Sequence, residues 1–195
     1  MTEKHNVELV EIYPEMFTWT FRNTEQNKFD KIYNKVLSNL HRNLKFTRKI
    51  DYRKQSNPYK YHFNVGDGWF GILKELIKGI RENDAKDNFK WTTKVTQVKE
   101  KFGGLRFYVT GTSDKSWKLI HKAEEKSYMV CEVSGSEVEV GQWVMGWCQT
   151  LSKKVALQRF YDEMDAGKIG EGVKFDDVWR PTEKSETIVT PKKKK

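Results

Sequence analysis

The residue types that most often carry catalysis are spread thinly along this chain. No two of the four histidines stand at the short spacing that zinc ligands usually show; they are His5, His41, His62 and His121. Acidic groups at residues 162–165 and 176–177 offer oxygen ligands to a hard metal ion, but such groups are common on solvated surfaces. No Gly-x-Ser-x-Gly nucleophile motif occurs. We therefore expect a protein that is not an enzyme, with no catalytic residue, no metal ion and no cofactor.

Two glycine-containing sequences raise the question of anion binding through backbone amides. Gly66-Asp67-Gly68 precedes a predicted helix, whose N-terminus attracts anions, but Asp67 would repel a phosphate and the P-loop pattern is missing. Phe102-Gly103-Gly104 leads from one predicted strand into another, whereas a phosphate-binding loop leads into a helix. We predict a helix cap and turn at the first sequence. At the second we predict a hairpin bend with a positive φ at Gly103 or Gly104.

Basic and aromatic residues form the pattern with the clearest chemical meaning. From Lys28 to Lys60 the chain has ten Lys and Arg against two Asp, a net charge of +8, and the whole chain has +9. Lys and Arg contact phosphates, and Tyr rings stack on bases. The predicted binding residues in this segment are Lys45, Arg48, Lys49, Tyr52, Arg53, Lys54, Tyr59 and Lys60. Three more, Lys99, Lys101 and Arg106, surround the Phe-Gly-Gly bend.

This charge distribution leaves three explanations open. An anionic partner is favoured, and it is nucleic acid in one hypothesis and a host protein in the other. A basic surface that only keeps the protein in solution accounts for the same charge. The C-terminal residues 181–195 add a net charge of +3 and end in four lysines. The sequence does not indicate an oligomeric state.

Composition and length indicate a protein with a real core and no membrane span. The chain has 195 residues, of which 37% are hydrophobic and 13% aromatic. No apolar run approaches the roughly 18–20 residues of a transmembrane helix, and the acidic N-terminus is unlike a secretory signal peptide. The two cysteines, Cys131 and Cys148, suggest no disulfide framework. We expect a cytoplasmic protein.

The periodicity of apolar residues predicts an α+β fold, with helices packed on a small antiparallel sheet. Residues 7–22 are rich in β-branched and aromatic residues, with Pro14 interrupting, and the alternation of apolar residues with Thr over 17–21 predicts a strand. Apolar steps of three and four predict helices over about 24–44 and after residue 68. Two strands are expected within 91–110. Val95 and Val98 would lie on opposite faces of a regular strand, so either a bulge or burial of both faces is expected there. A further helix follows Ser113, short strands fall within 129–151, and a last helix covers 151–165. The expected buried stripe of the helix after Ser113 contains Trp117, Ile120, His121, Glu124 and Tyr128.

The same patterns suggest three segments. Residues 1–64 are expected to form a basic extension with a strand and a helix, and residues 65–180 an α+β domain. Residues 181–195 are polar and rich in lysine, so we expect a disordered tail.

Four sequences in the middle of the chain resemble one protein family. They are GDGWFGILKELI from residue 66, VTQVKEKFGGLRFYV from 95, HKAEEKSYMVCEVSG from 121 and GWCQTL from 146. Together they resemble a family of small proteins that are frequent in tailed phages and prophages, and the match covers about residues 65–153. The resemblance implies a phage accessory protein in the cytoplasm of the host cell.

Members of that family often carry a cysteine-rich zinc site, and the resemblance implies a degenerate form of it at residues 129–152. Cys131 matches the first cysteine, while Ser134 and Ser152 stand at two later cysteine positions. Since zinc needs four N or S ligands in a closed site, we expect no structural zinc here. Apolar residues are available to fill the space; they are Val138, Val140, Trp143, Val144 and Trp147.

These observations favour a protein that acts by binding. Nucleic-acid binding through the basic segment is the first hypothesis, and inhibition of a host defence or replication enzyme is the alternative.

Overall fold

The computed structural model of the chain describes residues 1–17, 61–88 and 93–182. Its helices and two small antiparallel sheets confirm the predicted α+β class. The predicted helix over 24–44 and the basic segment Lys28–Lys60 lie outside the described residues, as does the tail beyond Thr182.

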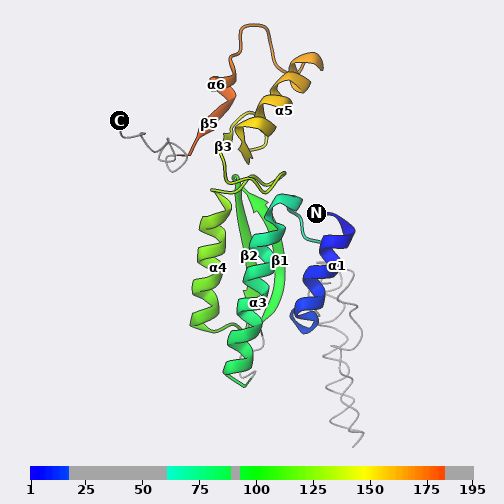
Figure 1. Ribbon diagram of the computed structural model, residues 1–195, viewed down its shortest axis with the longest axis vertical. Coiled ribbons are helices and arrows are strands. Elements are labelled where there is room, and N and C mark those ends of the chain that lie inside the picture. The colour runs from blue at the N-terminus through cyan, green and yellow to red at the C-terminus, as the bar shows by residue number, and fades with distance from the viewer. Residues whose placement is uncertain (18–60, 89–92, 183–195) are drawn as a thin grey trace, which may run out of the picture.

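The elements fall into two groups along the long axis of the molecule (Figure 1). The first group contains α1 (Glu3–Ile12), the 3-10 helices η1 (Pro14–Phe17) and η4 (Asp67–Trp69), α3 (Phe70–Lys86), β1 (Lys94–Lys101), β2 (Gly104–Thr110) and α4 (Asp114–Ser127). The second contains β3 (Val140–Trp143), β4 (Gln149–Ser152), α5 (Lys153–Asp165), α6 (Phe175–Val178) and β5 (Trp179–Pro181). Each group has its own cluster of buried apolar side chains.

The hairpin of β1 and β2 forms as the sequence predicts. Lys101 pairs with Gly104, so Phe102 and Gly103 make a two-residue bend. Their φ angles are 55° and 77°, and a type I′ turn requires a positive φ at both positions. Of the two alternatives for Val95 and Val98, the bulge is present, because the register shifts between Val95 and Gln97 and both valines are buried.

Helices α3 and α4 pack side by side, with α4 against β2 (Figure 1). The apolar stripe predicted for α3 is confirmed, and all of its members are buried: Trp69, Ile72, Leu73, Leu76, Ile77 and Ile80. Ser113 caps α4 by accepting a hydrogen bond from the Ser116 amide. The helical period of the sequence therefore sets the main packing of this group.

The N-terminal strand expected over 7–22 is wrong in its described part, where α1 and η1 form instead. The Thr2 side chain accepts a hydrogen bond from the His5 amide and caps α1. Asn6, Leu9 and Val10, which stand three and four residues apart, are buried at helical spacing. Leu9 and Val10 join the same core as α3, so burial on one helical face outweighs the β propensity of this segment.

The predicted buried face of α4 also needs correction. Trp117 and His121 are exposed, and small residues with Ile120 face the sheet instead; the buried residues are Ser116, Ile120, Ala123 and Ser127. Small residues face the sheet because α4 and β2 approach closely, as shown by the Leu105 amide of β2, which donates to the Ser127 hydroxyl at 2.8 Å. A tryptophan would not fit in that space.

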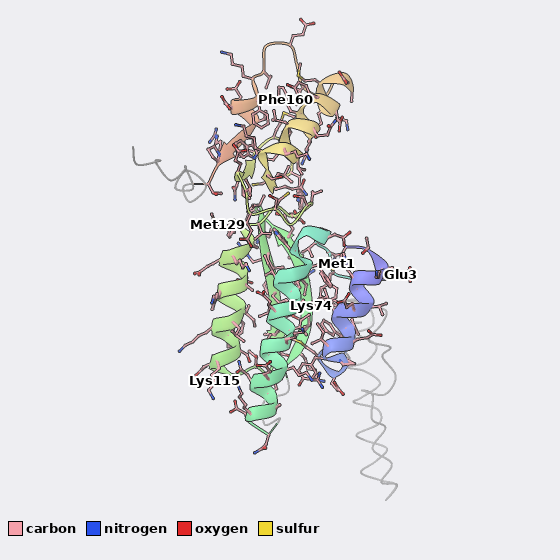
Figure 2. All side chains as sticks on the ribbon, viewed as in Figure 1. Met1, Glu3, Lys74, Lys115, Met129 and Phe160 are labelled. Atoms are coloured by element: carbon pink, nitrogen blue, oxygen red, sulfur yellow. The ribbon has the colours of Figure 1, made fainter. Side chains whose placement is uncertain are left out.

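The second group surrounds a three-stranded sheet with the order β4-β3-β5. Of the five apolar residues expected to fill the place of a zinc ion, only Val140 and Trp143 are buried. Val138, Val144 and Trp147 are exposed, which corrects that expectation. Side chains from later elements take up the space, among them Phe160, Val178 and Trp179. Figure 2 shows Phe160 at the far end of the molecule and Met129 where the two groups meet.

Hydrogen bonds join the two groups. The Gly66 amide donates to Oε1 of Glu132 at 2.9 Å, and the Thr150 hydroxyl of β4 donates to the Gly103 carbonyl between β1 and β2. Among the described residues, no helix is both long and apolar enough to cross a membrane.

Candidate functional site at the hairpin bend

The Phe102–Gly103 bend lies at the end of the hairpin that faces the second group of elements (Figure 1). The Thr150 hydroxyl of β4 donates to the Gly103 carbonyl. A Cβ atom on Gly103 would lie 3.0 Å from Nε2 of Gln142 and 3.4 Å from Sγ of Cys148. The φ angle therefore favours glycine at this position, and a larger residue would also press on side chains of the β3–β4 segment.

A cavity of about 400 Å³ opens between the bend and this segment. Its walls come from both groups of elements, and the lining residues are Lys99, Glu100, Lys101, Phe102, Gly146, Trp147 and Cys148. Small-molecule sites commonly have volumes of roughly 300–1,000 Å³, so the cavity is large enough for one flat ring system.

Two large aromatic side chains at this cavity are turned toward solvent. Phe102 is 70% exposed and Trp147 is 66% exposed. Phe102 also has a φ of 55°, a left-handed conformation that costs a non-glycine residue about 1–2 kcal/mol. Because neither exposure nor backbone strain helps this residue stabilise the fold, Phe102 is a candidate for a binding role.

Two of the predicted binding residues line the cavity, and each also lies over an exposed ring of the hairpin. Nζ of Lys101 is 5.2 Å from the centre of the Phe102 ring, and Nζ of Lys99 is 5.6 Å from the centre of the Tyr108 ring. Lys99 and Lys101 stand two residues apart on β1 and share one face of the hairpin. The structure thus brings together two ammonium groups and two exposed rings.

Arg106, the third residue predicted near the bend, does not line the cavity. It pairs with Lys99 across the hairpin, and its Nη2 donates to the Tyr128 hydroxyl at 2.9 Å. Its Nη1 donates to the Leu105 carbonyl at 2.7 Å, and the bond to Tyr128 raises the pKa of Arg106. These contacts give Arg106 a structural role next to the site. The other predicted binding residues lie outside the described part of the chain; they are Lys45, Arg48, Lys49, Tyr52, Arg53, Lys54, Tyr59 and Lys60.

A buried carboxylate forms one wall of the cavity. Glu100 is only 8% exposed, and its Oε1 accepts a hydrogen bond from the Gly103 amide at 2.6 Å. Its Oε2 is enclosed and has no hydrogen-bond partner among the described residues. An enclosed acceptor without a donor costs about 1–3 kcal/mol, so a ligand that donated a hydrogen bond to this oxygen would recover that cost.

The negative charge of the Glu100 carboxylate affects the thiol of Cys148, which also lines the cavity. Burial raises the pKa of Cys148, and the negative charge of Glu100 raises it further. Cys148 is partly exposed, whereas Cys131 is fully enclosed. The charge of Glu100 therefore acts at the cavity itself.

Sequence reasoning missed four residues of this site: Glu100, Phe102, Trp147 and Cys148. Phe102 had a usable signal, because an aromatic residue directly before two glycines stands at the tip of a hairpin. Trp147 was assigned to the core, and its exposure depends on tertiary packing that its own sequence neighbours do not reveal.

The three positions that the family resemblance links to zinc also meet in space. The Ser134 amide donates to Sγ of Cys131 at 3.4 Å. Burial opposes ionisation of Cys131, but hydrogen bonds from Ser134, Ser152 and Val133 outweigh it and lower the pKa of the thiol. Only one sulfur is present at these three positions. In residues 1–17, 61–88 and 93–182, no three or more His, Cys, Asp or Glu side chains gather in a way that could hold a metal ion.

A second, larger cavity of about 920 Å³ lies between the Cys131–Ser136 turn and α5. Two exposed apolar side chains, Val133 and Val138, stand in its wall.

Comparison of the chain with family models, curated proteins and solved structures finds no match.

Proposed function

We propose that this protein binds single-stranded nucleic acid without catalysing a reaction. The observation that supports this function best is the cavity at the bend, where the exposed rings of Phe102 and Trp147 lie with Lys99 and Lys101. Aromatic rings that stack on bases, next to cations that contact phosphates, are the usual means of binding single strands.

The two kinds of side chain have separate tasks in this proposal. A base stacked on Phe102 or Trp147 contributes about 1–3 kcal/mol, with little dependence on sequence. Lys99 and Lys101 contact the adjoining phosphates, and each contact releases condensed counterions. Duplex DNA keeps its bases stacked inside, so the rings favour a single strand over a duplex.

The basic segment Lys28–Lys60 supplies most of the electrostatic attraction in this account. It holds a net charge of +8, although its residues lie outside the described structure. The resemblance of residues 65–153 to phage and prophage proteins supports a role as a phage accessory protein that acts in the host cytoplasm.

Salt dependence tests the electrostatic part of the proposal. Changing Lys45, Arg48, Lys49, Arg53 and Lys54 to Ser should flatten the plot of log K against log salt concentration by about 3 units, since each phosphate contact on a single strand contributes about 0.7. Changing Lys99 and Lys101 to Ser should flatten it by about 1 unit. The matched control changes Lys118 and Lys122, which are exposed on α4 away from the cavity, and should leave the slope unaltered. Equal slopes for all of these proteins would contradict the proposal.

The larger cavity favours a second candidate function, inhibition of a host defence or replication enzyme. Exposed Val133 and Val138 give that surface an apolar character that suits a protein partner. A pull-down from host lysate, with and without nuclease, separates the two functions. A host protein that stays bound after nuclease treatment, and is lost from a Val133→Asp and Val138→Asp variant, would favour the inhibitor.

A further inference from the structure

We infer that the cavity at the bend is a nucleobase site in which Oε2 of Glu100 accepts a hydrogen bond from the amino group of a base. The inference rests on the proposed function and adds a preference among bases to it. Cytosine and adenine carry such an amino group on the edge that faces away from the sugar, whereas thymine and uracil present a carbonyl at that position, beside an N3–H. A carboxylate opposite the exocyclic group accepts from the amino group and repels the carbonyl. The protein should therefore prefer cytosine to thymine in single strands.

The geometry of the bend determines which oxygen of Glu100 lacks a donor. The Gly103 amide holds Oε1 of Glu100 at 2.6 Å, and no described residue donates to Oε2. Within the described part of the chain, the carboxylate is paired with a backbone amide and with no lysine: the nearby ammonium groups of Lys101 and Lys99 lie over the Phe102 and Tyr108 rings. A carboxylate can only accept hydrogen bonds, so its ligand must donate one.

Entry of a base requires a movement in the wall of the cavity, because Oε2 has almost no surface of its own. Exposed Phe102, Trp147 and Lys101 line the same cavity and have the freedom to turn. A base that stacks on one of these rings would bring its amino group toward the carboxylate. Stacking thus supplies affinity, and Glu100 supplies the choice of base.

The test compares oligo-dC with oligo-dT of about twelve nucleotides, a length within the site sizes of single-strand binding proteins. The two strands differ at the amino or carbonyl group, at N3, which accepts in cytosine and donates in thymine, and at the thymine methyl. Binding is followed by anisotropy of a labelled strand at neutral pH. The wild-type protein should bind oligo-dC about tenfold more tightly than oligo-dT, the discrimination that one good base contact gives. A matched pair of oligo-rC and oligo-rU removes the methyl group as a variable.

Glu100→Gln provides the decisive variant. The Gln oxygen must accept from the Gly103 amide, so the NH₂ group takes the place of Oε2 and offers a donor instead of an acceptor. The variant should lose the preference for cytosine and favour thymine or uracil. A second readout is alkylation of Cys148, which lines the cavity and should be protected by oligo-dC more than by oligo-dT.

The outcomes separate the inference from the function on which it rests. If the protein binds no oligonucleotide, the proposed function fails and takes the inference with it. If oligo-dC and oligo-dT bind equally well, or if Glu100→Gln keeps the preference for cytosine, the inference fails while the proposed function stands.

Discussion

The amide nitrogen of Gly103 lies 2.6 Å from Oε1 of Glu100, three residues earlier in the same hairpin. This bond ties the bend to a buried carboxylate and leaves the other carboxylate oxygen without a donor among the described residues. The conformation of the bend therefore sets the position of the carboxylate in the cavity. Substitutions of the bend glycines should disturb the fold, whereas removal of the Phe102 ring should disturb only binding.

Gly103→Val should destabilise the protein by roughly 1 kcal/mol or more, because a β-branched residue tolerates a φ of 77° poorly. Gly104→Val should also destabilise it, since a Cβ atom there would lie 2.3 Å from Cζ of Tyr128. Gly170→Val is the matched control, because a Cβ atom at Gly170 has nothing within 4 Å. Chemical denaturation measures all three, and a wild-type stability for both Gly103→Val and Gly104→Val would contradict the account of the bend.

Phe102→Gly should keep the stability of the protein or increase it by about 1 kcal/mol, because glycine adopts a φ of 55° without strain. Phe102→Ala retains that strain and serves as the comparison. Both variants should lose affinity for single strands to a similar extent, since both remove the ring. If Phe102→Gly unfolds more readily than Phe102→Ala, the strain does not exist as described.

The rate at which Cys148 is alkylated should depend on Glu100. Burial and the Glu100 carboxylate both raise the pKa of Cys148, so the reactive thiolate is scarce at neutral pH. Glu100→Gln removes the nearby negative charge, lowers the pKa and shifts the rate profile to lower pH. The Cys148→Ser variant gives the background, because Cys131 is fully enclosed. An unchanged profile in Glu100→Gln would place the carboxylate away from the thiol.

Asp84 joins three elements of the first group through a buried network. Its Oδ2 accepts hydrogen bonds from the Tyr13 hydroxyl at 3.0 Å and the Thr93 amide at 2.9 Å, and its Oδ1 accepts one from the Thr93 hydroxyl at 3.1 Å. Asp84→Ala should destabilise the protein by about 3 kcal/mol, because it leaves enclosed donors unpaired. Tyr13→Phe should cost about 1–2 kcal/mol, and a double-mutant cycle should show that the two losses are not additive.

The same network makes the stability of the folded protein depend on pH in the alkaline range. Burial first, and then the charge and hydrogen bond of Asp84, raise the pKa of Tyr13 well above its ordinary value. Because the folded protein holds this proton more tightly than the unfolded chain, stability is fully present below about pH 10 and falls as the pH rises above it. The stability of Tyr13→Phe should fall less over that range, and a parallel fall in both proteins would contradict this assignment.

The sequence was sufficient for elements whose period is strong and local. The apolar stripe of α3, the hairpin with its bulge and the positive φ at Gly103 all follow from residues within a few positions of each other. The sequence was insufficient for elements whose type or burial depends on contacts between segments that are distant in the chain. Residues 7–17 have strand-like composition, yet a helix buries Leu9 and Val10 against α3.

In the candidate site, too, some residues could be predicted from their sequence neighbours and others could not. Lys99 and Lys101 were predicted from their place beside the bend, and the structure puts both in one cavity wall. Trp147 was expected in the core, because the sequence does not reveal that Phe160, Val178 and Trp179 already fill it. The open oxygen of Glu100 had no sequence signal, since it depends on how the bend closes on its own side chain.

Binding of a labelled single strand at about 150 mM salt, with Trp147→Ala and Trp117→Ala compared with the wild type, tests the central claim most directly. Trp117 is exposed on α4 and does not line the cavity, so it is the matched control. The wild type and Trp117→Ala should bind with equal affinity, and Trp147→Ala should bind about tenfold more weakly, as expected for the loss of one base stack. If the wild type shows no binding up to tens of micromolar protein, or if both variants bind as the wild type does, the site at the bend does not bind nucleic acid.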